Sequence, residues 1–412
     1  MSLIHTQRQE ALIEDLKLSS LAERFDTPLF VYSGQFLENR CQEIIKAFSG
    51  YPTQVCYALK ANSNLSILKT IFRSGIGADV VSGGEFKKAL LAKCPSNQIV
   101  FSGVGKRVSE IEAALETGVL SFNAESVEEI QAIASVARKL KKKVPLSLRI
   151  NPNISVKTNP YIATGLYETK FGFPESQIGE ALEVLKETSE LELVGLSCHL
   201  GSQIQQLTPY AEATRRLRKI ASDLKHNGWT IRYLDLGGGF GVNYQGASAH
   251  SLQDYAKAIQ RELTNSSYLL VVEPGRSIVA ESGILLTRIL YQKKNARKSF
   301  VIVDASMTEL IRPALYDAYH PIEPCVKRKG SLKKVDVVGP VCETSDFLGL
   351  GRKLPPIKTG DLLWIGYCGA YASAMSSQYN VRPRAAEVLV TGKKATLIRR
   401  REKLEDLWED EL

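Results

Sequence analysis

The stretch Val55-Cys56-Tyr57-Ala58-Leu59-Lys60 is a short apolar run that ends in a lysine, and it begins a pattern that continues along the chain. A run of this length between polar residues is typical of a buried strand. Seven more such runs lie between roughly residues 50 and 275, at Ala78–Val81, Ile99–Ser102, Leu120–Phe122, Leu146–Ile150, Leu193–Cys198, Tyr233–Leu236 and Leu269–Val272. The sequence therefore predicts eight strands in this part of the chain.

The segments between these runs have the spacing of amphipathic helices, as in Ser126–Leu140, Glu175–Thr188 and Tyr210–Asn227. We expect Asn64 and Ser126 to cap helices and Pro174 to lie in the first turn of one. Strands and helices that alternate in this number fit a (β/α)8 TIM barrel. A doubly wound open sheet is the alternative, although the sequence has no GxGxxG after its first strand.

A chain of 412 residues is too long for one ordinary core, so a second domain is expected. From about residue 284 the apolar runs have no long helices between them: Ile284–Tyr291, Phe300–Ala305, Val335–Val341, Asp361–Tyr367 and Ala386–Val390. This pattern predicts an all-β domain of sandwich or barrel type. The run Thr27–Val31 could pair with these strands. We expect the barrel over residues 33–280 and the β-rich domain over 281–412 together with residues 1–32.

The charged residues are interspersed. The chain has 53 basic and 44 acidic side chains, a net charge of +9. Its densest basic clusters, Arg138–Lys143 and Arg399–Arg401, are short and contain no aromatic residues, so we interpret them as solvated faces rather than a nucleic-acid patch. The modest positive field suits an anionic substrate or cofactor.

The cysteine content and the N-terminal segment indicate a cytoplasmic protein. Seven cysteines without a CxxC pair argue against a disulfide framework and for a reducing compartment. Residues Met1–Leu16 are rich in polar side chains and contain no continuous apolar stretch. We therefore expect neither a signal peptide nor a membrane span, and no membrane partner.

Lys60 is the first candidate for chemistry. At the end of a buried strand an ammonium loses solvation, which favours the neutral and nucleophilic amine. Lysines of this kind form Schiff bases with carbonyl compounds, and pyridoxal 5'-phosphate (PLP) is the commonest such aldehyde in proteins. The alternative is a lysine whose side chain reaches from the strand end into water.

Polar residues and glycines follow several other predicted strands, where barrel enzymes place their active sites. They are Arg149 in the fifth strand, His199–Ser202 after the sixth, Gly237–Gly239 after the seventh and Glu273–Arg276 after the eighth. Three glycines allow a backbone to approach a phosphate group closely and to present N–H donors. A histidine can stack on an aromatic ring, and a carboxylate such as Glu273 keeps a pyridine nitrogen protonated. A plain turn, a core histidine and a surface glutamate are the alternatives.

Several motifs resemble, in the same order, those of the PLP-dependent amino-acid decarboxylases with the alanine racemase fold. They are Tyr57–Asn62, Gly77–Glu85, Cys198–Gln203, Asp235–Gly241 and Glu273–Arg276, followed in the second domain by Ile311–Tyr316, Val341–Glu343 and Gly369–Tyr371. In this combination the chain is similar to the diaminopimelate decarboxylases. The resemblance is collinear from about residue 28 to the C-terminus.

The resemblance implies a PLP site. Lys60 would hold PLP as a Schiff base, His199 would stack on its ring, and Glu273 would pair with the pyridine nitrogen. The complete set that the resemblance assigns to the cofactor is Lys60, Asp79, His199, Ser202, Gly238, Gly239, Glu273, Gly275, Arg276 and Tyr371. Of these, Ser202, the glycines, Arg276 and Tyr371 would contact the phosphate. No metal ligands are expected.

The resemblance also implies decarboxylation of meso-2,6-diaminopimelate to L-lysine and CO2, the last step of lysine biosynthesis. The substrate-binding set would be Arg276, Arg312, Tyr316, Glu343 and Tyr371. In it the arginines and Tyr316 would bind the distal carboxylate and Glu343 the distal ammonium. Cys342 would join Lys60 and His199 as a catalytic residue, by donating a proton after CO2 leaves. In the family Cys342 and Glu343 reach the partner subunit's site, so a homodimer with two composite sites is implied.

Three other functions are possible. A decarboxylase of the same fold acting on ornithine, arginine or carboxynorspermidine would not need Arg312 beside Tyr316. A racemase would need a tyrosine acid opposite Lys60, and a non-catalytic regulator should have lost Lys60 or the glycines. The chain departs from the family at Ser306, where glycine is common, and at Ser197, where histidine is frequent. Since serine adopts positive φ less freely than glycine, the sequence leaves the loop geometry near residue 306 open, although no proposed catalytic group is lost.

Overall fold

The computed structural model of the protein describes residues 3–156, 158–162, 164–165, 168–245 and 250–411. The chain forms two compact units. One comprises Cys41–Val242 and Ser248–Ser277, and the other comprises Met1–Arg40, Asn243–Ala247 and Ile278–Leu412. The first is called the barrel unit below and the second the β unit.

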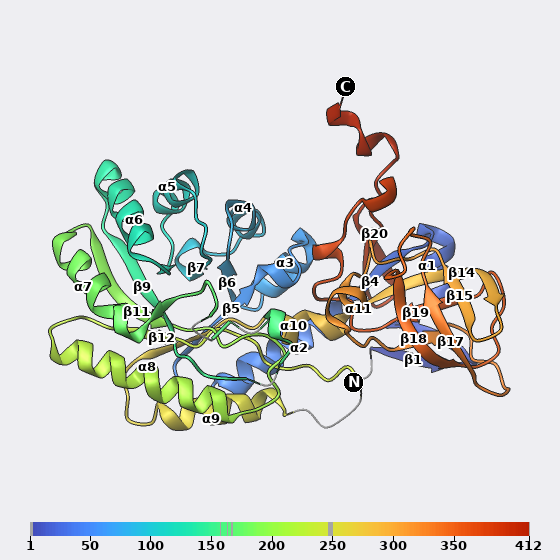
Figure 1. Cartoon of the computed structure of the whole chain (residues 1–412), viewed down its shortest axis with the longest axis horizontal. Coiled ribbons are helices and arrows are strands. Elements are labelled where there is room, and N and C mark those ends of the chain that lie inside the picture. The colour runs from blue at the N-terminus through green and yellow to red at the C-terminus, as the bar shows by residue number, and fades with distance from the viewer. Residues whose placement is uncertain (1–2, 157, 163, 166–167, 246–249, 412) are drawn as a thin grey trace. The chain divides into compact units, whose positions relative to one another are not determined.

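The barrel unit contains a closed parallel β-barrel (Figure 1). Its strands follow the order β9-β11-β12-β13-β5-β6-β7-β8, and β8 pairs with β9 to close the ring, while β10 adds to β9. Their bounds are β5 Thr53–Ala58, β6 Gly77–Val80, β7 Ile99–Phe101, β8 Ser121–Ala124, β9 Val144–Asn151, β10 Phe173–Pro174, β11 Leu191–Ser197, β12 Tyr233–Asp235 and β13 Leu269–Val272. The eight strands of the ring coincide with the eight predicted runs, so the (β/α)8 barrel is confirmed and the open sheet is excluded.

Helices connect these strands around the outside of the ring, except that the first of them precedes β5 and the last follows β13 (Figure 1). They are α2 Gly34–Phe48, α3 Leu65–Phe72, α4 Gly83–Leu91, α5 Val108–Thr117, α6 Val127–Leu140, α7 Ile178–Glu187, α8 Thr208–His226, α9 Leu252–Glu262 and α10 Arg276–Val279, with short 3-10 turns η1 Leu59–Ala61, η2 Ser96–Gln98, η3 Pro160–Ile162 and η4 Glu175–Gln177. In α6 the residues Ile130, Ile133 and Ala137 are buried, which is the helical spacing of one apolar face.

The predicted helix starts are confirmed at two of three positions. The side chain of Asn64 accepts a hydrogen bond from the N–H of Ser66 at 2.9 Å, and Ser126 accepts one from Glu129 at 3.2 Å. Each cap satisfies an N–H that the helix itself leaves without a partner. Pro174 was predicted one position too far inside, since it ends β10 and the turn η4 begins after it.

The β unit is built on a nine-stranded mixed sheet. The main path is β18-β17-β15-β14-β4-β20-β21, and β19 pairs with both β14 and β16. The bounds are β4 Leu29–Ser33, β14 Gly283–Lys294, β15 Ser299–Val303, β16 Ile322–Pro324, β17 Lys333–Val338, β18 Phe347–Leu354, β19 Leu362–Ile365, β20 Ala386–Thr391 and β21 Lys394–Arg399. The predicted β-rich second domain is confirmed. The N-terminal β4 lies between β14 and β20, antiparallel to the first and parallel to the second.

A smaller sheet and several short helices complete the β unit. The sheet has three strands, β1 Ile4–Gln7, β2 Glu10–Ile13 and β3 Leu16–Lys17, and the helices are α1 Leu18–Phe25, α11 Arg312–Tyr316 and the 3-10 turns η5 Ala280–Ser282, η6 Ser373–Met375, η7 Tyr379–Val381, η8 Glu405–Leu407 and η9 Glu409–Glu411. The N-terminal sheet was not predicted, because its strands are very short and largely polar.

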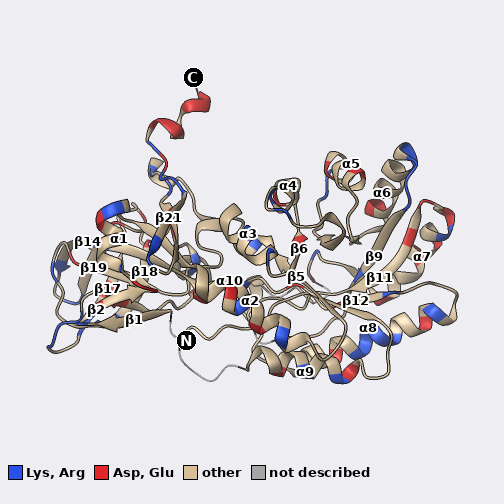
Figure 2. Ribbon diagram, turned by 180° about the vertical axis from the view of Figure 1, so that it is seen from behind, with Lys and Arg blue, Asp and Glu red and all other residues tan. Residues whose placement is uncertain are grey.

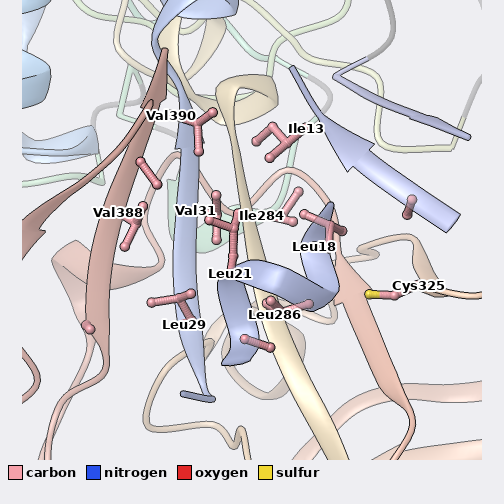
Figure 3. Close-up of a cluster of buried hydrophobic side chains, with 14 residues drawn as sticks. Ile13, Leu18, Leu21, Leu29, Val31, Ile284, Leu286, Cys325, Val388 and Val390 are labelled. Carbon is pink, nitrogen blue, oxygen red and sulfur yellow. The ribbon is translucent and has the colours of Figure 1, made fainter. Parts of the chain in front are cut away.

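Buried aliphatic side chains hold β4 in the centre of the larger sheet (Figure 3). Val31 of β4 packs in one cluster with Ile284 and Leu286 of β14 and with Val388 and Val390 of β20. Side chains of β2 and α1 belong to the same cluster. Complete burial of one such side chain contributes about 1.5–3 kcal/mol, so this cluster ties the N-terminal and C-terminal segments of the unit together.

The structure shows how the loop accommodates Ser306. Ser306 is buried, and the left-handed backbone positions among the described residues do not include it. Its hydroxyl oxygen lies 3.0 Å from Oε2 of Glu309, and its N–H donates to the same carboxylate at 2.9 Å. The serine hydroxyl therefore adds a hydrogen bond, at a position that does not need a left-handed backbone.

The helices of the barrel unit carry charges of both signs (Figure 2), and in α6 the acidic Glu128 and Glu129 lie in the first turn and the basic Arg138 and Lys139 in the last. Several of them form exposed pairs, including Arg138 with Glu190 and Arg215 with Glu262. Exposed pairs of this kind contribute at most about 1 kcal/mol each. Within the part of the chain that the structure describes, no helix has the length and apolar character needed to cross a membrane.

Candidate active site

The carboxyl ends of the barrel strands bring together the residues that the sequence singled out. Lys60 lies in the turn η1 directly after β5, and Asp79 is part of β6. His199 follows β11, the glycine triplet follows β12, and Glu273 follows β13. Since all strands of the ring are parallel, these positions share one rim of the barrel, where enzymes of this fold have their active sites.

Lys60 differs from its sequence-based description. Its neighbour Leu59 is fully buried, but Lys60 itself is exposed, and the expected desolvation of its amine is therefore wrong. The carboxyl groups of Asp79 and Glu273 interact with its positive charge. An exposed amine at the rim can be reached by a carbonyl compound from solvent.

The glycines after β12 are required by the neighbouring loops. A Cβ on Gly238 would lie 2.0 Å from the carbonyl oxygen of Glu273, and a Cβ on Gly239 would lie 2.1 Å from that of Gly201. Gly237 and Gly239 also have φ of +64° and +87°, which side chains rarely permit. The loops after β11, β12 and β13 therefore approach one another so closely that only glycine fits.

Two N–H groups of the triplet have partners inside the protein. Gly237 donates to Oδ1 of Asp235 at 2.9 Å, and Gly238 donates to Nδ1 of His199 at 3.3 Å. That the triplet binds a phosphate stays a prediction. The role of these two N–H groups is to orient the side chains of Asp235 and His199.

His199 is held as a neutral imidazole. Because a backbone N–H can only donate, Nδ1 accepts from Gly238 and the neutral ring carries its proton on Nε2. Burial, followed by the charges of Lys60 and Arg149, lowers the pKa of His199 well below its usual value. A neutral ring with a fixed plane is suited to stack on an aromatic ligand.

Three carboxyl groups, Asp79, Asp235 and Glu273, are buried near one another in the barrel. Burial raises the pKa of Asp79, and it raises the pKa of Asp235 to about 6. Burial and then the charge of Asp235 raise the pKa of Glu273 well above its usual value, because two neighbouring buried carboxyl groups resist carrying a charge at the same time. Asn123 supports the pair by donating from Nδ2 to Oδ2 of Asp235 at 3.1 Å.

This acidic cluster fits the pyridine ring of PLP. Among the described residues, Oδ1 of Asp79 and Oε1 of Glu273 are buried and have no hydrogen-bond partner. A buried polar atom without a partner costs about 1–3 kcal/mol, so the site favours a ligand that brings a donor or a positive charge. A protonated pyridine nitrogen is such a group, and Lys60 supplies the amine for the aldehyde on the same rim.

Arg276 and Ser202 form an anion site on the rim. Nη2 and Nε of Arg276 donate to Oγ of Ser202 at 3.0 and 3.3 Å, and the guanidinium is buried. The preceding Gly275 packs closely on the turn after β5, since a Cβ there would lie 3.1 Å from Cβ of Ala61. A buried guanidinium beside a hydroxyl suits a phosphate or a carboxylate.

The remaining predicted residues belong to the β unit. Arg312 and Tyr316 begin and end α11, and the buried guanidinium of Arg312 contacts Tyr244 and His320. Cys342 and Glu343 lie in a loop after β17, where both are exposed, so the alternative of a plain buried cysteine is wrong. Oε1 of Glu343 accepts a hydrogen bond from Tyr379 at 2.6 Å. Tyr371 has a left-handed φ of 55° in the loop after β19.

Sequence reasoning gave no role to several residues that shape these sites. Asp235 interrupts the apolar run Tyr233–Leu236, and an acidic residue inside a buried strand is the signal that could have marked it. Asn123 offers a weaker signal of the same type in β8. Tyr244 and His320 have no local signal, because only the fold brings them to Arg312.

Comparisons with known proteins agree with this site. Residues 35–280 match the family model of the pyridoxal-binding domain of pyridoxal-dependent decarboxylases. The chain is 45% identical over 396 residues to a diaminopimelate decarboxylase of Vibrio cholerae, covering 96% of this chain and 95% of that protein. It is 46% identical over 399 residues to one of Neisseria meningitidis serogroup B, covering 97% and 96%.

A solved structure shows the same relationship. The crystal structure of diaminopimelate decarboxylase from Helicobacter pylori complexed with L-lysine has a TM-score of 0.92 and 44% identity, and the match covers 95% of this chain and 98% of that one. Together with the acidic cluster, the rim lysine and the glycine loops, these likenesses identify the fold and the cofactor class. The chain belongs to the pyridoxal-dependent decarboxylases and, within them, to the diaminopimelate decarboxylase family.

Proposed function

We propose that the protein removes CO2 from meso-2,6-diaminopimelate to give L-lysine, with PLP as cofactor. This reaction is the last step of lysine biosynthesis. The observation that carries the proposal is made at the rim of the barrel. There Lys60 follows β5, the neutral His199 follows β11 and the buried Glu273 follows β13. The family relationship supports the same cofactor.

The barrel residues divide the work of holding the cofactor. Lys60 would bind its aldehyde, His199 would cover one face of its ring, and Glu273 with Asp79 would meet its ring nitrogen and neighbouring atoms. Ser202, Gly238, Gly239, Gly275 and Arg276 would surround its phosphate, with Tyr371 from the β unit. When bound, PLP supplies an electron sink for the carbanion that remains as CO2 departs.

The substrate carries an amino-acid group at each end, so one end must be held while the other reacts. The distal carboxylate would be bound by Arg276, Arg312, Tyr316 and Tyr371. The distal ammonium would be bound by Glu343. Charge-assisted hydrogen bonds contribute about 1.5–3 kcal/mol each. A substrate without the distal carboxylate leaves buried guanidinium groups without that partner, which is a penalty against lysine, ornithine and arginine.

The proton that replaces CO2 would come from Sγ of Cys342. A positioned proton donor contributes roughly 10²–10⁴ in rate. Cys342 and Glu343 would act in the site of the partner subunit, which makes the active species a homodimer with composite sites.

We also propose that residues 33–280 are the cofactor-binding domain and that the protein works in the cytoplasm, where its seven cysteines stay reduced.

A CO2-release assay tests the function directly. The purified protein is incubated with meso-diaminopimelate, L-lysine, L-ornithine or L-arginine, each with and without added PLP. We expect kcat/KM on diaminopimelate to exceed the other three by at least about a hundredfold. Equal rates on ornithine and diaminopimelate would overturn the substrate assignment, and no CO2 from any substrate would overturn the enzyme assignment.

A second experiment tests Lys60 without using turnover. The wild-type protein should be yellow, with the visible absorbance of PLP bound to a lysine. Lys60→Ala should abolish that band, whereas Lys69→Ala on the neighbouring helix α3 should keep it. Persistence of the band in Lys60→Ala would remove the central assignment.

A further inference from the structure

Arg312 is fixed through a histidine that the sequence left without a role. Nη1 of Arg312 lies 2.7 Å from Nε2 of His320, and Nδ1 of His320 lies 2.8 Å from the carbonyl oxygen of Gly366. Both side chains are buried, with exposed fractions of 5% for Arg312 and 0% for His320. The histidine therefore connects the guanidinium to the backbone of the segment after β19.

These contacts determine the protonation state of His320. A carbonyl oxygen only accepts, so Nδ1 carries the proton; a guanidinium only donates, so Nε2 offers its lone pair. His320 is thus a neutral imidazole with one defined tautomer. A second proton would face the N–H of a permanent cation at 2.7 Å.

Tyr244 holds the same guanidinium from a second direction. Its hydroxyl accepts from Nη1 of Arg312 at 3.2 Å, and its ring centroid lies 5.0 Å from Cζ. Its ring also packs edge-on against His320 at 5.3 Å between centroids. Both N–H groups of Nη1 are accounted for by these two acceptors, and together with the ring they fix the plane of the guanidinium.

We propose that His320 is a positioning residue for substrate recognition, which holds the guanidinium of Arg312 in the orientation that binds the distal carboxylate of diaminopimelate. The inference rests on the proposed function of Arg312. Two-point binding of a carboxylate depends on the plane of the guanidinium, because its two N–H groups must reach both oxygens. His320 contributes to fixing this plane, because its Nε2 accepts a hydrogen bond from Nη1 of Arg312.

The KM for diaminopimelate should depend on pH. The groups around His320 in the described part of the chain include the cation of Arg312, the ring of Tyr244, the carbonyl of Gly366 and the thiol of Cys368, whose Sγ lies 3.9 Å from Nδ1. A protonated His320 repels Arg312 and releases its guanidinium. The KM for diaminopimelate should therefore rise as the pH falls, while the amount of bound PLP stays constant.

Two substitutions separate positioning from packing. His320→Asn keeps a donor for Gly366 but loses the acceptor for Arg312, and we expect KM for diaminopimelate to rise roughly 10- to 100-fold with kcat changed less than about threefold. His320→Gln places an oxygen near the Nε2 position, so it should restore KM to within about threefold and abolish the rise of KM at acid pH. His226→Gln, on the exposed end of α8, is the matched control and should change neither.

A double-mutant cycle tests whether His320 acts through Arg312. Arg312→Lys should raise KM by itself, because lysine lacks the planar fork. Adding His320→Asn to it should raise KM by less than a further twofold, whereas two independent effects would multiply. Multiplied effects, or a KM of His320→Asn equal to the wild-type value, would overturn the proposal.

The experiment distinguishes this inference from the function on which it rests. If the wild type does not decarboxylate diaminopimelate, the function fails; if it does and KM is insensitive to His320, only the positioning role fails. Slow turnover of L-lysine, which has no distal carboxylate, should be unaffected by His320→Asn. Should His320→Asn not fold, Tyr244→Phe removes the other acceptor from a less buried position and should raise KM about threefold; an unchanged KM there overturns the proposal.

Discussion

At the scale of single residues, the buried carboxyl groups under the barrel rim should control how stability depends on pH. The pKa of Asp235 rises from 3.8 to about 6, first because of burial, and the pKa values of Glu273 and Asp79 are raised too. At these three groups the folded state therefore binds more protons than the unfolded chain between pH 4 and 6. Their contribution to stability falls as the pH rises through this window and stays reduced above it.

Asp235→Asn should remove much of this pH dependence. The substitution abolishes one buried negative charge, and the neighbouring amide of Asn123, whose Oδ1 has no partner among the described residues, can rotate to accept from the new amide. We expect PLP-free protein with Asp235→Asn to gain on the order of 1–3 kcal/mol at pH 8 and little at pH 4.5. Thermal unfolding followed by circular dichroism from pH 4.5 to 8 measures this, and parallel curves for the two proteins would contradict it.

Their places at the ends of apolar runs singled out Lys60, His199 and Glu273, and the order of the motifs along the chain gave these residues their predicted roles. The exposure of Lys60 and the protonation of His199 could be determined only from the folded structure. Lys60 is exposed although it follows a buried strand, and His199 is neutral because the N–H of Gly238 occupies Nδ1. Such contacts join loops that are far apart in sequence, so no local pattern contains them.

At the scale of elements, the loop after β12 should tolerate no side chain at Gly238. A Cβ there would lie 2.0 Å from a backbone oxygen of Glu273, so the loops after β12 and β13 must move apart. We expect Gly238→Ala to cost about 1–3 kcal/mol and to weaken PLP binding, because Glu273 moves with its loop. Chemical unfolding and titration of PLP absorbance provide the two readouts.

Gly179 in α7 is the matched control for this prediction. It is exposed, and a Cβ there would meet no atom within 4 Å. Gly179→Ala should stabilise the protein by up to about 1 kcal/mol, since glycine is unfavourable inside a helix, and should leave PLP binding unchanged. If Gly238→Ala behaved in the same way, the close packing of the rim loops would not be what requires glycine.

The strands of the barrel could be predicted because each one is buried on both faces and forms an apolar run between polar helices. The N-terminal sheet β1–β3 could not, since its strands are short and His5, Thr6 and Gln7 are exposed. Strand β18 also escaped prediction, because Gly349 and Gly351 interrupt it and Arg352 lies within it. These strands pair with their neighbours in the sequence, β1 with β2, β2 with β3 and β18 with β17, but their own residues carry little strand signal.

At the scale of the whole molecule, the proposed homodimer makes each active site depend on two chains. Lys60 is on the barrel unit and Cys342 is an exposed residue of the β unit. Cys342→Ala alone should retain PLP and slow turnover at least about tenfold, since it removes the proton donor. Lys60→Ala alone should be inactive, so each variant disables a different contribution to the site.

Mixing the two variants tests the composite sites. If subunits exchange in a 1:1 mixture, half of the dimers contain one chain of each kind, and in these one site has both Lys60 and Cys342 intact while the other has neither. About a quarter of all sites are then complete, so activity should recover to about a quarter of the wild-type value. If each site were formed by a single chain, no mixture would contain a complete site, and the activity would stay at the average of the two variants. CO2 release measured before and after subunit exchange therefore decides whether Cys342 acts in its own subunit or in its partner.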